Sequence, residues 1–216
     1  MKSTKGLMNF LENYKNKISD SEYEKLKWDI DVASEMFRKE LLKYAPGFER
    51  GRRVQELLDQ EIAKESKVQS SCQKGCSACC HFEVEITKDD AEVLKQAVQN
   101  GAEFDRVRAD EIANRTRENA DWKKGMVPSN RCVFLSNDGA CRVYQARPSS
   151  CRKLSVVGPV IECERPDGQP ILRVIPMAEI LMNVSINLPD NNIGSLCKML
   201  VQALADDPKP NSDVAL

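Results

Sequence analysis

The chain has 216 residues, of which 30% are charged and 41% hydrophobic, and its formal net charge is −1. This length can bury one substantial core, and the balanced charge excludes a strongly basic nucleic-acid binder and an acidic tail protein. Every longer apolar stretch is interrupted by charge or proline, and no apolar segment of a signal peptide follows the start. We therefore expect a cytoplasmic protein that binds neither nucleic acid nor a membrane.

Nine cysteines and a single histidine indicate the chemistry of the chain. In a protein that is not secreted, so many cysteines favour metal or redox chemistry over disulfides. The lone His81 excludes metal sites that need two histidine ligands. The sequence also lacks a G-x-G-x-x-G fingerprint, a phosphate-binding loop and a G-x-S-x-G elbow, so an ordinary dehydrogenase, methyltransferase or NTPase is not expected.

The first 70 residues contain no cysteine and are predicted to form a helical layer, residues 1–70. Ser21 and Glu24 have the spacing of a capping box. Apolar residues then recur at helical spacing, and Pro46 with Gly47 ends the run. The first helix is marked by Leu26, Ile30, Ala33, Phe37 and Leu41, and a second by Val54, Leu57, Leu58 and Ile62. We expect both helices to pack on a core.

The middle segment, residues 71–165, holds eight of the nine cysteines. Residues 83–86 alternate like a short strand, and Thr87 with Asp90 caps a helix that ends near Gln99. A weaker helix is predicted over 104–119. Residues 132–135 and 140–144 flank the turn 136–139 and predict a hairpin in which Phe134 pairs with Cys141.

The last segment, residues 166–216, is predicted to be helical with a frayed tail from 206 onward. Its apolar stripe comprises Ile193, Leu196, Cys197, Leu200, Val201 and Leu204. Cys197 lies inside this stripe and is interpreted as a small buried hydrophobe that lies apart from the other cysteines. The fold class expected for the whole chain is mainly α with a small β-hairpin, a single compact cysteine-rich metal-binding domain with flanking helices.

The first cysteine cluster comprises Cys72, Cys76, Cys79 and Cys80, four thiols within nine residues. The C-x-x-C spacing lets two thiolates reach one metal. Side chains of adjacent residues diverge in either helix or strand, so one small site would hardly hold both Cys79 and Cys80. Two metals, a larger cluster or one cysteine that is not a ligand are the alternatives.

The second set comprises Cys132, Cys141, Cys151 and Cys163. The predicted hairpin makes Cys132 and Cys141 diagonal neighbours roughly 7–8 Å apart, which suits two ligands of an ion or cluster. Pro148 as the first helical residue would place Cys151 near a positive helix end that favours its thiolate.

Basic side chains and the histidine accompany these cysteines. Arg147 and Arg152 are expected to offset the negative charge of a thiolate site, whereas Arg142 and Lys153 are interpreted as surface residues. His81 is expected to be exposed or beside the site rather than a ligand.

These motifs resemble a bacterial family of zinc- or iron-chelating domains whose hallmark is C-x-x-C-x-x-C-C. Residues 76–80 match the end of that hallmark, 132–135 match its C-x-F-L element, and 141–152 match C-x-x-Y-x-x-R-P-x-x-C-R. Cys163 fills the last place, while Cys72 departs because three residues separate it from Cys76. The resemblance covers about 72 to 165 and implies that zinc or an iron–sulfur cluster is bound by Cys72, Cys76, Cys79, Cys80, Cys132, Cys141, Cys151 and Cys163.

Three functions remain open. The first is metal or cluster binding without catalysis, as a chelator, electron carrier, maturation or sensing module. The second is an enzyme, because Cys72, Cys76 and Cys79 have the spacing of a radical S-adenosylmethionine cluster and flagellin lysine N-methylases are similar in their cysteine set. Against the radical enzyme, Ala78 stands where an aromatic residue is usual. The third is a structural zinc module in a protein–protein adaptor. The choice of metal, the division of the cysteines and any protein partner stay open.

Overall fold

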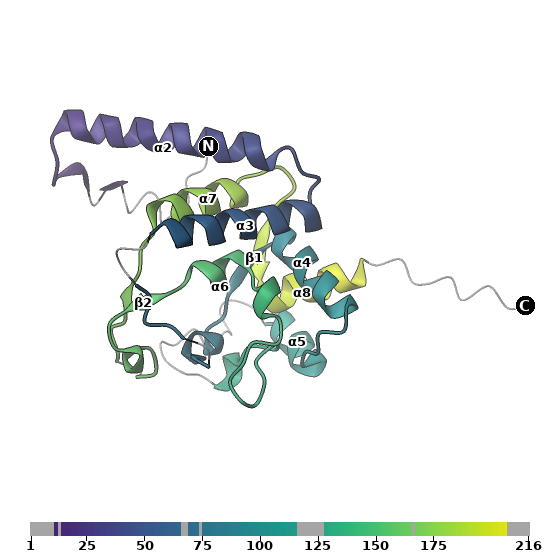
Figure 1. Cartoon of the computed structure of the whole chain (residues 1–216). Coiled ribbons are helices and arrows are strands. Elements are labelled where there is room, and N and C mark those ends of the chain that lie inside the picture. The colour runs from purple at the N-terminus through teal and green to yellow at the C-terminus, as the bar shows by residue number, and fades with distance from the viewer. Residues whose placement is uncertain are drawn as a thin grey trace, which may run out of the picture.

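The computed structural model describes residues 11–12, 14–65, 69–73, 75–115, 128–165 and 167–206. Over these residues the protein is mainly helical with two small antiparallel two-stranded sheets (Figure 1), which confirms the predicted fold class. The α-helices are α2 (Asp20–Leu41), α3 (Phe48–Lys64), α4 (Lys88–Gln99), α5 (Arg106–Ala113), α6 (Ser149–Lys153), α7 (Pro176–Ile186) and α8 (Leu196–Ala205). The strands are β1 (Glu85–Thr87), β2 (Val156–Val157), β3 (Ile171–Leu172) and β4 (Ile193–Ser195), and the 3₁₀ turns include η1 (Ala78–His81) and η4 (Val160–Cys163). None of the described helices is both long and apolar enough to cross a membrane.

Helix α2 begins two residues earlier than predicted. Ser19, not Ser21, is the N-cap and forms the capping box with Glu22. The sequence offers the same Ser-x-x-Glu spacing at both serines, and the earlier start adds helical hydrogen bonds once the helix is nucleated. The predicted apolar stripe is confirmed, because Ile30, Phe37 and Leu41 are buried.

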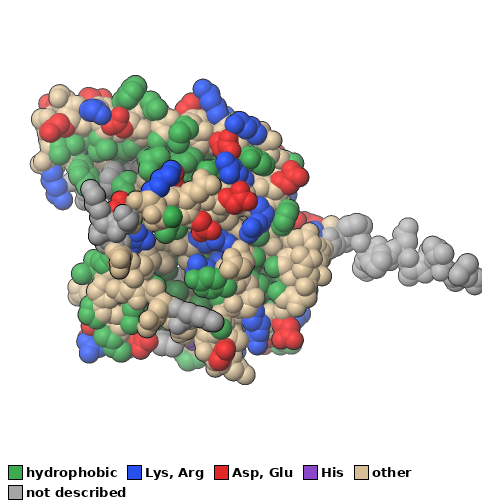
Figure 2. All heavy atoms as spheres, in the orientation of Figure 1, with side chains coloured by type: hydrophobic (Ala, Val, Ile, Leu, Met, Phe, Trp, Pro, Cys, Tyr) green, Lys and Arg blue, Asp and Glu red, His purple; other side chains and the backbone are tan. Residues whose placement is uncertain are grey.

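A first core lies between α2, α3 and α7. Figure 1 shows α7 packed beside both N-terminal helices, α2 and α3. A helix from the C-terminal part of the chain therefore completes the N-terminal layer. Its buried residues are Ile30, Phe37, Leu41, Val54, Leu57, Leu58, Ile175, Ala178, Ile180, Leu181, Val184 and Leu188. The face of the molecule in Figure 2 carries interspersed positive, negative and hydrophobic side chains over α2 and α3.

A second core joins the cysteine segment to α8. Strand β1 pairs antiparallel with β4, with Ile86 opposite Gly194, and α8 packs on α4 and α5. The core comprises Ile86, Ala91, Leu94, Ala109, Ile112, Val133, Phe134, Val143, Leu196, Cys197, Met199, Leu200 and Ala203. The stripe predicted around Cys197 is confirmed as core at Leu196, Cys197 and Leu200. Ile193 is an exception, because it lies in β4, before the helix begins at Leu196, and is exposed.

A buried ion pair joins the two cores. Arg50 on α3 and Asp89 on α4 both have side chains 2% exposed, and the arginine Nε lies 2.6 Å from the carboxylate. Arg50 also donates to the carbonyl of Pro189 at 3.1 Å. A Cβ on Gly51 would lie 2.5 Å from the carbonyl oxygen of Asp89, so only glycine permits this close crossing of α3 and α4. The contact holds α4 at a fixed position against α3.

The predicted hairpin is wrong in register and extent. Only one isolated bridge forms, and it pairs Leu135 with Cys141 instead of Phe134 with Cys141. The hydroxyl of Ser136 accepts from the Ala140 amide at 3.0 Å and donates to the Ala140 carbonyl at 2.7 Å. These bonds close a loop of five residues, with Gly139 at a φ of 81°, and the backbone turns again at Cys132 rather than continuing a ladder.

Three further boundaries differ from the sequence prediction. The strand predicted at 83–86 is β1, which begins two residues later at Glu85. The helix predicted over 104–119 is α5, which ends at Ala113, and 116–119 lie outside the described residues. The tail beyond 206 also lies outside them.

Candidate metal centre

The two cysteine-bearing stretches meet in space. The amide of Cys132 donates to the carbonyl of Cys80 at 2.7 Å, and the loop at Gly139 packs against the carbonyl of Gly75. The amide of Ser71, directly before Cys72, donates to the carbonyl of Val156 in β2 at 2.8 Å. Backbone contacts therefore hold the first cluster against the segments that carry the second set.

Seven of the eight predicted ligand cysteines line one cavity of about 1020 Å³. They are Cys72, Cys76, Cys79, Cys80, Cys132, Cys141 and Cys151. Cys163 does not line it, but burial and then the charges of Cys72, Cys76 and Cys79 raise the pKa of Cys163, so it lies within electrostatic range of the first cluster. All nine cysteines are free thiols.

Cys197 lies at the wall of the same cavity. It is 5% exposed and belongs to the second core, as predicted, and burial raises its pKa to about 12. We expected it to lie apart from the other cysteines, whereas it lines their cavity. Helical periodicity indicates that a residue is buried, but it carries no signal that the buried face borders a cavity.

The buried thiols of the second set are not activated by their surroundings. Burial raises the pKa of Cys132 to about 11, and burial followed by the charge of Cys132 raises the pKa of Cys151. The expected preference of Cys151 for its thiolate is therefore wrong in direction. Pro148 is the N-cap of α6, but this helix has only five residues and burial outweighs its effect. Such thiols become good ligands when a cation replaces their protons.

Cys79 and Cys80 behave as a pair within η1. The hydrogen bond between their sulfurs lowers the pKa of Cys79 to about 7 and, together with burial, raises the pKa of Cys80. The first ionisation of the pair therefore belongs to Cys79, and Cys80 keeps its proton.

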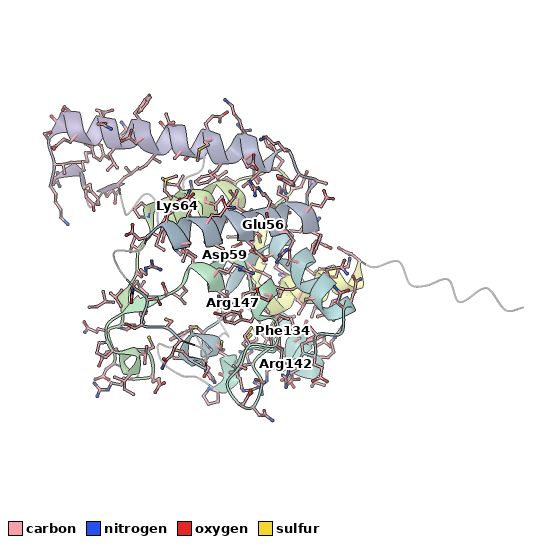
Figure 3. All side chains as sticks on the ribbon, viewed as in Figure 1. Glu56, Asp59, Lys64, Phe134, Arg142 and Arg147 are labelled. Atoms are coloured by element: carbon pink, nitrogen blue, oxygen red, sulfur yellow. The ribbon has the colours of Figure 1, made fainter. Side chains whose placement is uncertain are left out.

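Arg147 supplies positive charge to the cavity, as predicted. It lines the cavity with Phe134 (Figure 3), and after larger effects of burial and hydrogen bonding its charge lowers the pKa of Cys79 and of Cys141. Its guanidinium carbon lies 3.9 Å from the ring centre of Tyr144. Its Nε is buried and has no hydrogen-bond partner among the described residues, so this N–H can donate to a thiolate.

Arg152 plays a different part from the one expected. Its guanidinium lies 2.7 Å from Asp59 of α3, and its Nε donates to the carbonyl of Arg147 at 2.9 Å. These contacts hold the Arg147 loop against α3 rather than offset the charge of the cysteines. Lys153 pairs with Glu179 of α7 at 2.6 Å, and Arg142, at the surface as predicted, lies 3.9 Å from Glu103.

A buried carboxylate positions α6 and therefore Cys151. Asp90 is 1% exposed and accepts from the amide and hydroxyl of Ser149 at 2.9 and 2.8 Å. Its other oxygen accepts from the amide and hydroxyl of Thr87, which completes the predicted capping box. The box was visible in the sequence, whereas the link to Ser149, 59 residues away, was not.

His81 is buried, at 9% exposure, rather than exposed. Its Nδ1 lies 3.2 Å from the carbonyl oxygen of Ser77, and the ring is not among the residues that line the cavity.

The donor set of the cavity suits soft metals. Thiolates are the ligands of structural zinc and of iron–sulfur clusters, and the buried N–H of Arg147 can satisfy a ligating sulfur. Within the described ranges, no three Cys, His, Asp or Glu side chains are grouped closely enough to enclose one ion.

Comparison with known proteins agrees with this donor set. Residues 71–167 match the family model CxxCxxCC, which is described as "Putative zinc- or iron-chelating domain". No curated protein matches the chain, and no solved structure matches it. The stretch 71–167 of this chain is therefore similar to the CxxCxxCC family of cysteine-cluster domains.

Proposed function

We propose that this protein binds zinc or an iron–sulfur cluster through eight cysteines, with no defined catalytic activity. The ligands proposed are Cys72, Cys76, Cys79, Cys80, Cys132, Cys141, Cys151 and Cys163. The observation that supports this most is the gathering of seven of them around one cavity. The family description supports chelation of zinc or iron. In this proposal residues 71–165 form the metal-binding domain between the helical segments 1–70 and 166–216.

The surroundings of the cavity support a resident metal. A bound cation would compensate the burial that keeps Cys132 and Cys151 protonated. Arg147 would offset the remaining negative charge and donate its Nε–H to a sulfur. Free thiols persist in a reducing compartment, so we propose a cytoplasmic location for a protein that acts as a chelator, electron carrier, or maturation or sensing module.

The test is purification of the full chain without oxygen, followed by absorption spectroscopy and counting of zinc, iron and sulfide per chain. An iron–sulfur cluster gives a brown protein with iron and sulfide, and zinc gives a colourless one. A chain that holds neither metal after purification, and takes up neither when supplied with zinc or with iron and sulfide, would contradict the proposal.

The second candidate is a metal-dependent enzyme, and the shape of the cavity supports it. The cavity continues from the sulfurs to apolar side chains such as Phe82, Ile112 and Met182, and so has room for an organic ligand beside a metal. Binding of S-adenosylmethionine by the metal-loaded protein, measured by calorimetry, would favour this candidate over a plain metal-binding protein.

A further inference from the structure

We propose that β3 is a docking edge for a second copy of this chain, whose own β3 pairs with it antiparallel. The two β2–β3 sheets would then join into one continuous sheet across a two-fold axis at Leu172. This surface is separate from the cysteine cavity, because Ile171, Leu172 and Val174 do not line that cavity. The inference is therefore independent of the proposed function.

The backbone of Leu172 faces away from β2. In an antiparallel ladder, opposed residues alternate between pairs that exchange hydrogen bonds and pairs that do not. Arg173 donates its amide to the carbonyl of Ser155 at 2.9 Å, so these two residues form a hydrogen-bonded pair. The next pair, Leu172 opposite Val156, is then not hydrogen-bonded. The carbonyl of Val156 agrees with this, because it accepts from the amide of Ser71 on the far edge of β2.

The open edge of β3 therefore carries the N–H and the C=O of Leu172. Among the residues that the structure describes, neither group has a hydrogen-bond partner. The side chains beside them are apolar and exposed, because Ile171 is 63% exposed, Leu172 56% and Val174 55%. Side chains of successive strand residues point to opposite faces, so both faces of β3 are uncovered. A two-stranded sheet is only marginally stable, and further strands on its edge would stabilise it.

The usual protection of an edge strand is missing at Leu172. Edge strands are normally guarded by charged side chains or by proline. The charged residue that follows β3, Arg173, is turned inward and donates to the carbonyls of Ile62 and Glu65 at the end of α3. Its charge therefore satisfies the end of a helix instead of guarding the edge. Pro170 precedes β3, so it removes a backbone donor only at the beginning of the strand.

This edge is complementary to itself. With a two-fold axis at Leu172, this residue lies opposite Leu172 of the second copy, and each N–H donates to the other carbonyl. The same register places Pro170 opposite Val174 of the second copy, so apolar side chains meet on that face. The formal net charge of −1 gives little repulsion between two copies. Figure 1 shows β2 at the periphery of the molecule, away from α4 and α8, where a second copy can approach.

The experiment measures the mass of the full chain by analytical ultracentrifugation over a series of concentrations. A reductant is present, so that disulfides between the free cysteines do not contribute. We expect the mass to rise with concentration from 24.3 kDa toward twice this value. Amide hydrogen exchange in the peptide that contains Leu172 should slow over the same concentrations, because this amide is bonded only in the dimer.

Two variants and two controls test the edge itself. Leu172→Pro removes a donor that β2 does not use, and it should abolish the rise in mass, whereas Leu172→Val keeps the backbone donor and should retain it. Val174→Lys places like charges near the axis and should also abolish the rise. The matched control is Val107→Lys in α5, because that valine is 71% exposed and lies in a different element. This control should retain the rise in mass.

A chain that stays a monomer at every concentration would overturn the proposal and leave the edge to a strand of another protein. A dimer that both Leu172→Pro and Val174→Lys retain would overturn it as well, because the copies would then meet through another surface. Should circular dichroism show that Leu172→Pro does not fold, Val174→Lys and its control still decide the outcome.

Discussion

The bond between Ser149 and Asp90 offers a sharp test of how the cysteine segment is held. Ser149→Ala removes a 2.8 Å hydrogen bond from a hydroxyl 3% exposed to a carboxylate 1% exposed, while the amide of residue 149 remains bonded. The neighbouring Ser150→Ala is a matched control, because it removes an exposed 2.8 Å bond to the neutral carbonyl of Glu85. Both substitutions introduce the same side chain into the same short helix.

The expected magnitudes differ because one acceptor is a buried carboxylate. A hydrogen bond to a charged group contributes about 1.5–3 kcal/mol and a neutral one about 0.5–1.5 kcal/mol. We therefore expect Ser149→Ala to lower the free energy of unfolding by about 2 kcal/mol, and Ser150→Ala by about 0.5 kcal/mol because its bond is exposed. With a urea dependence of about 2 kcal/mol per molar, the midpoint of Ser149→Ala falls by about 1 M.

The loss of stability caused by Ser149→Ala should also depend on pH, with a defined sign. Burial raises the pKa of Asp90, and the bonds from Ser149 oppose that rise. The folded state therefore binds more protons than the unfolded state between the ordinary and the raised pKa, so stability falls as pH increases through that window. Ser149→Ala raises the pKa of Asp90 further, and its deficit relative to the unmodified protein should shrink as pH falls toward the ordinary range of aspartate.

The assay is urea unfolding of the metal-loaded proteins at several pH values, read as the difference between variant and unmodified chain. Equal midpoints for Ser149→Ala and Ser150→Ala at neutral pH would refute the reasoning. So would a deficit that grows toward acid pH.

The geometry supports two further predictions. Cys141→Ser, or removal of the metal by a chelator, should unfold the middle segment while part of the flanking helical signal remains, since metal-binding free energy there is folding free energy. The control Cys197→Ser should lower the free energy of unfolding by only about 1–2 kcal/mol. Equal metal content and equal melting temperature in Cys141→Ser and the unmodified chain would exclude a structural metal site. Asp89→Ala leaves Arg50 buried without its counter-ion and should cost about 3–5 kcal/mol in urea unfolding, whereas a loss below about 1 kcal/mol would show that the pair does not hold the cores together.

Patterns confined to a few neighbouring residues were enough to predict the helices and the kind of site. The Thr87–Asp90 capping box and the apolar stripes of α2, α3 and α8 repeat at helical spacing and are confirmed. The cysteine motif is also a local pattern, because the spacing of its thiols indicates metal binding independently of the rest of the chain. Even here, the predicted capping box at Ser21 was wrong, because Ser19 has the same Ser-x-x-Glu spacing and the structure begins α2 after Ser19.

Contacts between distant segments were decided by the tertiary structure alone. The pairing of β1 with β4 joins residues more than a hundred positions apart, and the ion pair of Arg50 and Asp89 unites two cores. The hairpin prediction was wrong because a serine hydroxyl closed the loop and shifted the register by one residue. Cys197 reached the wall of the cavity through the packing of α8. Periodicity along a chain shows which face of a segment is buried, but which segments meet there depends on the packing of the whole molecule.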